Sequence, residues 1–374
     1  MIYKQFQNLQ LSALGMGCMR LPLTAQGDQI DQQAVEEMVA CAMARGVNYY
    51  DTAWGYHDGN SEYAIGKALA AYPRDRFYLA DKFPGYDLSN MGKVEEIFEA
   101  QLKKCQVDYF DFYLFHNVCE MNIDAYLDPQ YGILDYLLQQ KKNGRIRHLG
   151  FSCHGALPVL ERFLEAYGDK MEFCQLQLNY IDWIFQNGAE KVALLNKYQI
   201  PVWVMEPLRG GRLAHLDEQQ SAALCAVAPE RSLPAWAFRF LQGIPGVTVI
   251  LSGMSDLGQL KDNLDIFETD QPLNDEEQRA LLELGRSMTN PKALACTACR
   301  YCTSHCPQGL DIPHLLALYN EHRFTGGGFI APMALSAIAP DKQPSACIGC
   351  RSCEAVCPQQ LKISQAMADF ASLL

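Results

Sequence analysis

The amino-acid sequence predicts a (β/α)8 TIM barrel followed by a smaller domain, and three observations support that prediction. The chain has 374 residues, more than one hydrophobic core usually organises. Short apolar runs alternate with amphipathic segments up to about residue 267, and eight of the fifteen cysteines lie after residue 295. We therefore expect a barrel over residues 1–270, a connecting helix over 271–290 and a second domain over 291–374.

Eight runs rich in β-branched or aromatic residues are expected to form the strands. Most are almost continuously hydrophobic, as strands buried on both faces are. They span residues 14–19, 47–53, 77–83, 111–117, 146–152, 173–180, 201–208 and 247–253. No G-x-G-x-x-G motif follows the first run, which disfavours an open doubly wound sheet. Eight alternations in roughly 250 residues indicate a closed barrel instead.

Amphipathic segments and breakers complete the expected order of elements. Apolar residues three and four positions apart predict helices over 31–46, 90–105, 156–169 and 274–288. Residues 1–14 are typical of a hairpin that closes the bottom of the barrel. The glycines at 326–328 and the stretch 331–344 predict a loop between the two halves of the second domain.

The composition restricts the possible partners. A formal net charge of -12 disfavours nonspecific binding to nucleic acid or to an anionic membrane, because both favour a basic surface. The chain has no run of eighteen apolar residues, and its first residues lack the apolar centre of a signal peptide. We therefore expect a cytoplasmic protein whose partners are small molecules and other proteins.

Two cysteine runs carry the strongest motif, C-x2-C-x2-C-x3-C-P. In this motif three cysteines bind one [4Fe–4S] cluster, and the fourth reaches the other cluster. Structural zinc is the alternative, but zinc sites use separated C-x2-C pairs. The runs resemble bacterial two-cluster ferredoxins, which implies a small α+β ferredoxin-like domain. The two expected ligand sets are Cys296, Cys299, Cys302 with Cys357, and Cys347, Cys350, Cys353 with Cys306.

Four polar residues stand at or just after the ends of three consecutive expected strands. They are Asp51, Tyr56, Lys82 and His116. Chemistry in barrel enzymes takes place at the C-terminal ends of the strands, so these positions favour a functional role. A nearby ammonium favours the phenolate, so Lys82, itself paired with Asp51, is expected to lower the pKa of Tyr56.

The motifs D51-T-A-W-G-Y56, D81-K82 and L-F-H116-N resemble those of the aldo-keto reductase family over about residues 1–270. The resemblance implies that Tyr56 is the general acid toward a carbonyl oxygen, that Lys82 and Asp51 tune it, and that His116 orients the substrate. It also implies hydride donation by NADPH or NADH. The cofactor-binding positions that it implies are Gly17, Cys18, Met19, Ser152, Gln175, Met205, Pro207, Leu208, Arg209, Gly211, Gly253, Gln259, Asp262 and Asn263.

Three departures from the family pattern affect the cofactor. Cys153 and His154 follow Ser152, where the family often has asparagine, and Met205 stands where an aromatic ring commonly stacks on the nicotinamide. Gly253 and Gln259 occupy positions where basic residues would grip a 2′-phosphate. The choice between NADH and NADPH therefore stays open.

Three functional interpretations follow. The leading one is a nicotinamide-dependent reductase of a small aldehyde or ketone, or the reverse alcohol oxidation, with two clusters as an electron relay. A ferredoxin- or flavodoxin-type carrier is then a further expected partner. The second has a reductase barrel beside a structural or interaction iron–sulfur domain. The third is an electron-transfer or redox-sensing protein with an inactive barrel.

Overall fold

The computed structural model describes every residue except 28, 290–293, 295, 297–299, 301 and 358–359. Cys299 and Pro358 therefore lie outside the described residues. The chain divides into two compact units. The first consists of Met1–Val118 and Asn122–Leu282, and the second of Cys119–Met121 and Glu283–Leu374.

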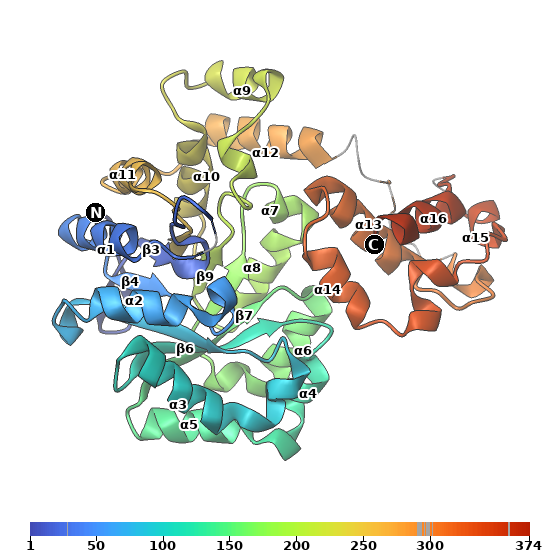
Figure 1. Ribbon diagram of the computed structural model, residues 1–374. Coiled ribbons are helices and arrows are strands. Elements are labelled where there is room, and N and C mark those ends of the chain that lie inside the picture. Colours follow the sequence, from blue (N-terminus) through green and yellow to red (C-terminus); the bar gives the residue numbers. More distant parts are fainter. Residues whose placement is uncertain (28, 290–293, 295, 297–299, 301, 358–359) are drawn as a thin grey trace. The chain divides into compact units, whose positions relative to one another are not determined.

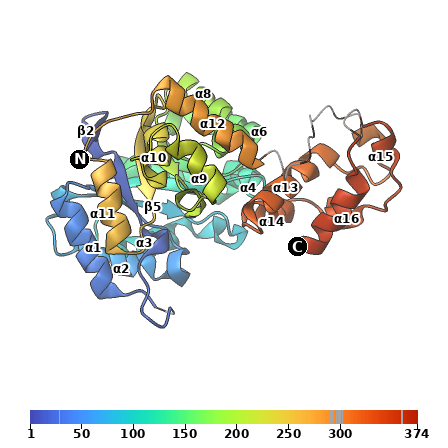
Figure 2. The same ribbon diagram turned by 90° about the horizontal axis from the view of Figure 1, so that it is seen from above.

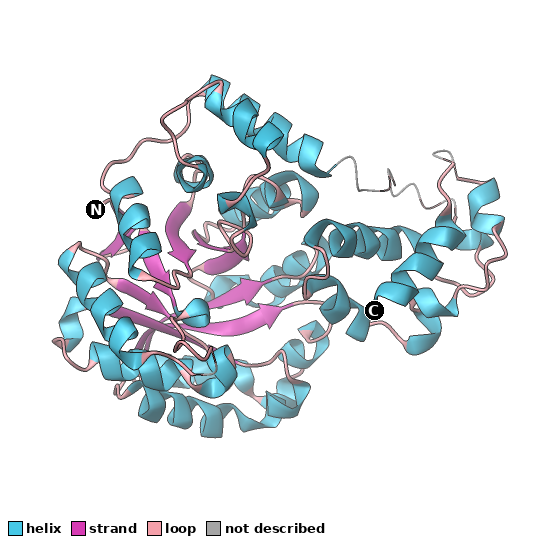
Figure 3. Cartoon of the chain, turned by 45° about the horizontal axis from the view of Figure 1, so that its top comes forward, coloured by secondary structure: helices cyan, strands magenta, loops and turns pink. Residues whose placement is uncertain are grey.

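Eight parallel strands close into a barrel in the first unit (Figures 1 and 3), in the order β10-β3-β4-β5-β6-β7-β8-β9. The predicted (β/α)8 barrel is therefore confirmed. Each observed strand overlaps one predicted run, although several are shorter. The strands are β3 (Leu14–Gly17), β4 (Tyr49–Asp51), β5 (Tyr78–Phe83), β6 (Phe110–Val118), β7 (Ile146–Cys153), β8 (Cys174–Gln177), β9 (Val202–Met205) and β10 (Val247–Ser252).

Helices cover the outside of the barrel, and neighbours such as α1, α2 and α11 pack side by side (Figure 2). Those between the strands are α1 (Gln32–Ala44), α2 (Ser61–Leu69), α3 (Val94–Cys105), α4 (Ile123–Leu127), α5 (Ile133–Lys142), α6 (Leu157–Tyr167), α7 (Asp182–Phe185), α8 (Gly188–Lys197), α9 (Glu218–Cys225) and α10 (Leu233–Gln242). After β10 follow α11 (Leu257–Ile266) and α12 (Asp275–Thr289). Among the described residues, no helix is long and apolar enough to cross a membrane.

A hairpin precedes the barrel, as the sequence predicts. Strands β1 (Tyr3–Phe6) and β2 (Leu9–Ser12) pair antiparallel. Phe6 and Leu11 are buried against residues near the N-terminal ends of the barrel strands, among them Phe112 and Trp203. Phe6 meets the Trp203 ring edge-on at 5.0 Å between ring centroids. Apolar packing therefore fills the bottom of the barrel, and the opposite end is left for polar residues.

The second unit has one apolar core with both cysteine runs against it. Its helices are α13 (Ile312–Thr325), α14 (Ile330–Ser336), α15 (Ser352–Ala355) and α16 (Ile363–Leu373). Leu315, Leu316 and Tyr319 of α13 pack with Met367 and Phe370 of α16. Cys302 and Cys353 are buried in the same core, and Cys296, Cys306, Cys347 and Cys357 pack against it.

Two details of this unit differ from the sequence-based expectation. Its described residues form helices and turns without a strand, so the expected α+β mixture is not found among them. The stretch 331–344, expected to be a loop, instead forms most of α14 and the 3-10 turn Pro340–Lys342, and it ends at the start of a second such turn, Pro344–Ala346. Ala331, Ala334 and Leu335 are buried in the core, so burial of a helical face outweighs the nearby proline and glycine breakers.

We predict that Phe6→Ala lowers the free energy of unfolding of the barrel by about 3–5 kcal/mol, because it leaves a cavity among rigid rings. Tryptophan fluorescence during urea unfolding measures the change, since all four tryptophans lie before residue 237. The matched control is Gln5→Ala on the exposed face of β1, expected within about 0.5 kcal/mol of the wild type. Equal losses for both variants would contradict the packing role of Phe6.

Candidate active site

The four predicted catalytic residues lie together at the C-terminal ends of adjacent strands. Asp51 is the last residue of β4, Lys82 is the fifth residue of β5, and His116 lies near the end of β6. Tyr56 begins the 3-10 turn Tyr56–Gly59 that follows β4. Because β4, β5 and β6 are neighbours in the barrel, these side chains converge on one place.

Lys82 and Asp51 form a buried ion pair. The Lys82 ammonium donates to Asp51 Oδ1 at 2.6 Å and to the main-chain oxygen of Thr52 at 2.7 Å. The two side chains are 1% and 4% exposed. Burial lowers the pKa of Lys82, but Asp51 and the Tyr56 phenol outweigh burial, so the pKa is raised. Lys82 therefore keeps its positive charge in the barrel.

Tyr56 lies over this ion pair. The Lys82 nitrogen is 5.1 Å from the centroid of the Tyr56 ring. Burial raises the pKa of Tyr56 to about 12, although Lys82 acts in the opposite direction. The expectation of a lowered phenol pKa is therefore wrong, because the loss of solvation exceeds the attraction of the ammonium. Tyr56 consequently holds its proton at neutral pH.

The turn after Tyr56 fixes its direction. His57 and Asp58 adopt left-handed conformations, with φ of 51° and 54°. The His57 Nε2 accepts a hydrogen bond from the main-chain N–H of Leu21 at 3.0 Å. Two successive left-handed residues are costly and persist only where surrounding contacts hold them. The chain thus reverses sharply and leaves the Tyr56 ring above Lys82.

His116 stands between two tyrosine rings. Its ring centroid is 6.1 Å from that of Tyr56 and 5.1 Å from that of Tyr86, both edge-on. Burial and the nearby charge of Lys82 lower the pKa of His116 well below its ordinary value. The imidazole is therefore neutral, so it can donate one hydrogen bond and accept another.

Ser152 lies near the end of β7 and is paired in register with Gln175, the second residue of β8. Both are buried, and the Ser152 hydroxyl accepts from the main-chain N–H of Asn117 at 2.7 Å. Gln175 Oε1 is buried and meets no hydrogen-bond donor within the described part of the chain. The site thus offers an unsatisfied amide oxygen at the height of the four polar residues.

Residues 17–19 come from the end of β3 and the turn after it. Gly17 is partly exposed, Cys18 is completely buried, and Met19 is half exposed. Burial raises the pKa of Cys18 far above the range of a reactive thiol. Cys18 therefore serves as packing, and only Gly17 and Met19 of this group present surface.

Met205 ends β9, and the loop after it holds Pro207, Leu208, Arg209 and Gly211. Arg209 is buried and binds the equally buried Asp182, with Nη2 3.0 Å from Oδ1. Asn179 holds the other carboxylate oxygen at 2.7 Å and also donates to the main-chain oxygen of Glu206 at 3.0 Å. Arg209 thus anchors the loop from inside and is not presented on its surface as a phosphate ligand.

The residues after β10 divide into exposed and buried members. Gly253, Gln259 and Asp262 are exposed, whereas Asn263 is buried and donates to the Ser252 hydroxyl at 3.1 Å. Gln259 bonds to Asp256, which caps the start of α11. Asn263 therefore ties α11 to the end of β10, and the other three residues border solvent.

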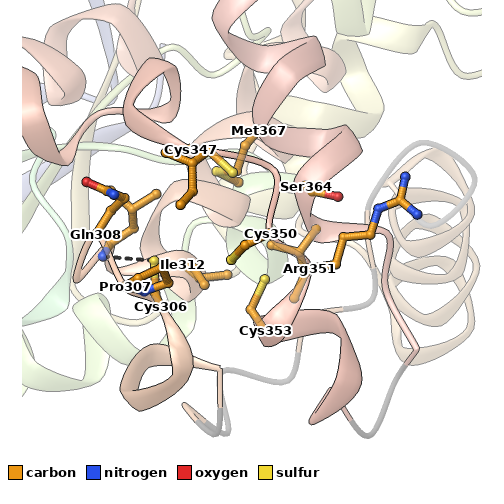
Figure 4. A pocket seen from close by; sticks show the side chains of 13 residues that line it. Cys306, Pro307, Gln308, Ile312, Cys347, Cys350, Arg351, Cys353, Ser364 and Met367 are labelled. Atoms are coloured by element: carbon orange, nitrogen blue, oxygen red, sulfur yellow. Dashed lines mark hydrogen bonds between the residues drawn. The ribbon is translucent and has the colours of Figure 1, made fainter.

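Four of the predicted cluster ligands line one pocket in the second unit (Figure 4). They are Cys306, from the first run, and Cys347, Cys350 and Cys353, from the second. Apolar residues surround them, and the main-chain N–H of Leu310 donates to Cys306 Sγ at 3.5 Å. Hydrogen bonds from Ser352 lower the pKa of Cys350, whereas burial raises that of Cys353 to about 11. The fourth cysteine of one run thus joins three of the other.

The remaining predicted ligands are Cys296, Cys302, Cys357 and Cys299. The first three pack on the core of the second unit, and Cys299 lies outside the described residues. Although four cysteines line the pocket of Figure 4, no three His, Cys, Asp or Glu side chains in the described part of the chain are placed so that they could hold one metal ion. The pocket of Figure 4 is lined by its four cysteines, by apolar side chains and by Gln308, Arg351 and Ser364.

Comparison with known proteins identifies the barrel. The aldo/keto reductase family model matches residues 13–286, more than half of the chain. The chain belongs to the aldo/keto reductase family. It is an NAD(P)-dependent oxidoreductase of aldo-keto reductase type. A second model, the 4Fe-4S dicluster domain, matches residues 295–362, so an iron–sulfur domain follows the aldo-keto reductase barrel.

Relatives and solved structures resemble the aldo-keto reductase part. YqkF, an uncharacterized oxidoreductase of Bacillus subtilis, is 23% identical over 73% of this chain and 92% of its own. The NADH-specific methylglyoxal reductase of Escherichia coli is 26% identical over 55% and 66%. The holo form of an aldo-keto reductase from Bacillus halodurans has a TM-score of 0.63 and 25% identity, covering 76% of this chain and 96% of that one. An aldo/keto reductase from Klebsiella pneumoniae in complex with NADP and acetate has a TM-score of 0.60 and 21% identity, covering 75% and 93%.

Sequence reasoning missed two contributors to this aldo-keto reductase site. Tyr86 packs edge-on against His116, and its hydroxyl lies so close to Gly55 that a Cβ there would be 2.3 Å away. Asp182 anchors Arg209 from the start of α7, the short helix after β8. The Pro-Gly turn after Lys82 offered the only signal for Tyr86, since it marks a loop at the catalytic end of β5.

We predict that Lys82→Met destabilises the aldo-keto reductase barrel by about 3–5 kcal/mol. The substitution keeps the approximate length of the side chain and leaves the Asp51 carboxylate buried without its cation. Urea unfolding followed by tryptophan fluorescence measures the loss. Lys67→Met removes an exposed lysine 3.4 Å from Glu36 and should cost less than about 1 kcal/mol. A Lys82→Met protein as stable as this control would contradict the buried pair.

Proposed function

We propose that this protein reduces a small aldehyde or ketone with hydride from NADPH or NADH, and oxidises the alcohol in the reverse direction. Tyr56 is the proton donor, Lys82 and Asp51 support it, and His116 orients the carbonyl. One observation carries the proposal: a buried, charged Lys82 lies directly beneath a protonated Tyr56 and beside a neutral His116.

Each side chain has a distinct part in the reduction. His116, being neutral, can donate a hydrogen bond to the carbonyl oxygen and hold it near the Tyr56 hydroxyl. When hydride reaches the carbonyl carbon, the oxygen gains negative charge and becomes a stronger base than a phenolate. It then takes the Tyr56 proton, and the Lys82 ammonium stabilises the phenolate that remains.

The residues present suit a nicotinamide. When bound, this group supplies the hydride. The buried Gln175 oxygen and the neighbouring Ser152 offer an acceptor and a hydroxyl for its carboxamide. Gly17 and Met19 border the same end of the barrel, and Met205 offers a polarizable surface where an aromatic ring would stack. The named relatives include an NADH-specific reductase and a complex with NADP, so both nucleotides belong in the test.

We predict that Tyr56→Phe lowers kcat for carbonyl reduction by about 10²–10⁴-fold, because it removes the proton donor and keeps the ring. Oxidation of NADPH and NADH is followed spectroscopically with a panel of aldehydes and ketones. Tyr63→Phe, an exposed tyrosine on α2, is the control with unchanged kcat. Unaltered turnover in Tyr56→Phe would refute the assignment of the acid.

We further propose that the second unit holds two [4Fe–4S] clusters that relay single electrons in a cytoplasmic, reducing environment. Cys306 joins Cys347, Cys350 and Cys353 in one pocket, which supports ligand sets shared between the runs. Cys350 and Ile348 are exposed at this pocket, so a ferredoxin- or flavodoxin-type carrier could approach the cluster closely there. A hydride carries two electrons and a cluster accepts one, so a relay also requires a step that splits the pair.

A structural role for the iron–sulfur unit is the second candidate, and one observation favours it. Both cysteine runs pack on the same apolar core, so cluster binding would also hold α13 and α16 together. Under this alternative the reductase turns over without exchanging electrons with the clusters. An inactive barrel is the third interpretation, and the buried Lys82–Asp51 pair argues against it, because such a pair is costly to retain without a use.

We predict that protein purified without oxygen carries about eight irons and eight sulfides per chain. Cys306→Ala should lose part of this iron and change the electron paramagnetic resonance spectrum of the reduced protein, since Cys306 lines the pocket of the second run. The control is Cys225→Ala, an exposed cysteine of the barrel. Stoichiometric zinc without sulfide would contradict the clusters. Unchanged turnover of folded Cys306→Ala would favour the structural role.

A further inference from the structure

A second group of titratable side chains lies on the opposite side of β5 from the Lys82 ammonium. Asp81, the residue before Lys82, and Glu62, in the first turn of α2, are both fully buried. Gln101 of α3 joins them, with its amide nitrogen 2.8 Å from Asp81 Oδ1 and 3.0 Å from Glu62 Oε1. The proposed reaction uses none of these three residues directly.

In the described part of the chain, the hydrogen bonds of this group leave Asp81 Oδ2 with only a weak donor. The Gln101 amide has two hydrogens but faces three acceptors, because it also lies 3.0 Å from the main-chain oxygen of Lys82. Its own oxygen is occupied by the Tyr113 hydroxyl at 2.6 Å. Asp81 Oδ2 is approached by the Cys105 thiol, a weak donor, at 3.7 Å. A proton shared between the Asp81 and Glu62 carboxyl groups, which contact each other, would supply the hydrogen bond that Asp81 lacks.

The charges lead to the same conclusion. Lys104 binds Glu62 Oε2 at 2.7 Å, and the Lys82 ammonium is held by Asp51. The groups that act electrostatically on Asp81 are Glu62 of α2, Cys105 of α3, Tyr113 of β6 and Lys82 of its own strand, together with Tyr86 and Cys18 from the neighbouring loops. Among the described residues, Lys104 is therefore the cation that binds this pair of buried carboxyl groups, and two adjacent buried carboxylates cannot both ionise cheaply.

We propose that Asp81 and Glu62 form an acid pair that shares one proton and that positions the catalytic residues. The inference rests on the proposed reductase function. The proton resides on Asp81, because Glu62 has Lys104 and the N-terminus of α2 to stabilise its charge. Burial and the Glu62 carboxylate raise the pKa of Asp81 well above its ordinary value.

The pair contacts the backbone of Lys82 on one side and, through Lys104, the turn that carries Tyr56 on the other. Asp81 Oδ1 accepts from the Lys82 N–H at 2.8 Å, and Gln101 binds the Lys82 oxygen, so the lysine backbone is held on both sides. Lys104, bound to Glu62, lies 3.8 Å from the centroid of the Trp54 ring and 3.5 Å from the Gly59 oxygen. These two residues bracket the turn that carries Tyr56. Asp81 and Glu62 are therefore positioning residues.

Asp81→Asn and Asp81→Ala together test the pair. Asparagine supplies an N–H where the protonated acid has its O–H, so kcat at neutral pH should stay within about twofold of the wild type. Alanine removes that donor and should lower kcat at least about tenfold. The matched control is Glu172→Gln. In the wild type, the Glu172 carboxylate binds His148 at 2.9 Å, and its hydrogen bonds lower its pKa to about 2. Because Glu172 is ionised at neutral pH, replacing it with glutamine should lower the free energy of unfolding, in contrast to Asp81→Asn.

The pH dependence of stability gives a readout that a merely structural role would leave unmoved. The folded protein holds the Asp81 proton to higher pH than the unfolded chain does, so stability declines as pH rises above the unfolded pKa of about 4. In Asp81→Asn this contribution is absent, so its Tm should decline less than that of the wild type between about pH 5 and pH 10. Parallel profiles, or an Asp81→Asn enzyme as slow as Asp81→Ala, would overturn the proposal.

A spectroscopic measurement covers the case in which these variants do not fold. Infrared spectra of the wild type at neutral pH, with isotope-labelled aspartate, should show a protonated aspartate carbonyl band. Glu62→Gln should shift this band by changing its hydrogen-bond partner. A wild type without a protonated aspartate would overturn the proposal. Neither spectra nor stability depend on turnover, so failure of the reductase assignment would leave them intact.

Discussion

The buried ion pair between Lys82 and Asp51 is the interaction on which the rest of the catalytic site depends. Removing both charges from water costs several kcal/mol for each ion, and only close geometry recovers that cost. The 2.6 Å contact and the second bond to the Thr52 oxygen provide that geometry. The pair in turn fixes a positive charge under Tyr56, and burial together with that charge lowers the pKa of His116 and keeps it neutral. The parallel pairing of β4 with β5 brings the two residues together.

The residues that stabilise the barrel and the residues of the catalytic site lie at opposite ends of its axis. Aromatic rings and the N-terminal hairpin fill the end where the strands begin, and the ion pair, Gln175 and Ser152 occupy the end where they finish. Outside β5, the carboxyl groups of Asp81 and Glu62 add a polar layer that reaches Lys82 through its backbone. The iron–sulfur unit is stabilised in a different way. Its small apolar core is built around two cysteine runs, so cluster binding and folding are expected to be linked there.

Much of the fold and part of the site could be predicted from the sequence. Runs buried on both faces located all eight barrel strands, and the strand-end rule brought Asp51, Lys82 and His116 together. The remainder depends on tertiary contacts that periodicity does not encode. Burial of one face made residues 330–336 helical, and desolvation raised the pKa of Tyr56. The family resemblance implied Arg209 as a cofactor-binding residue, but in the structure Arg209 is buried in an ion pair with Asp182.

The most direct test of the central claim is a double-mutant cycle on Asp51→Asn and Lys82→Met, measured as the free energy of unfolding. If the two residues form one buried pair, the double variant should be no less stable than Lys82→Met alone, because neither charge is then left unpaired. The coupling free energy should be at least about 2 kcal/mol. Strictly additive losses would show that the two residues act independently and would contradict this account of the site.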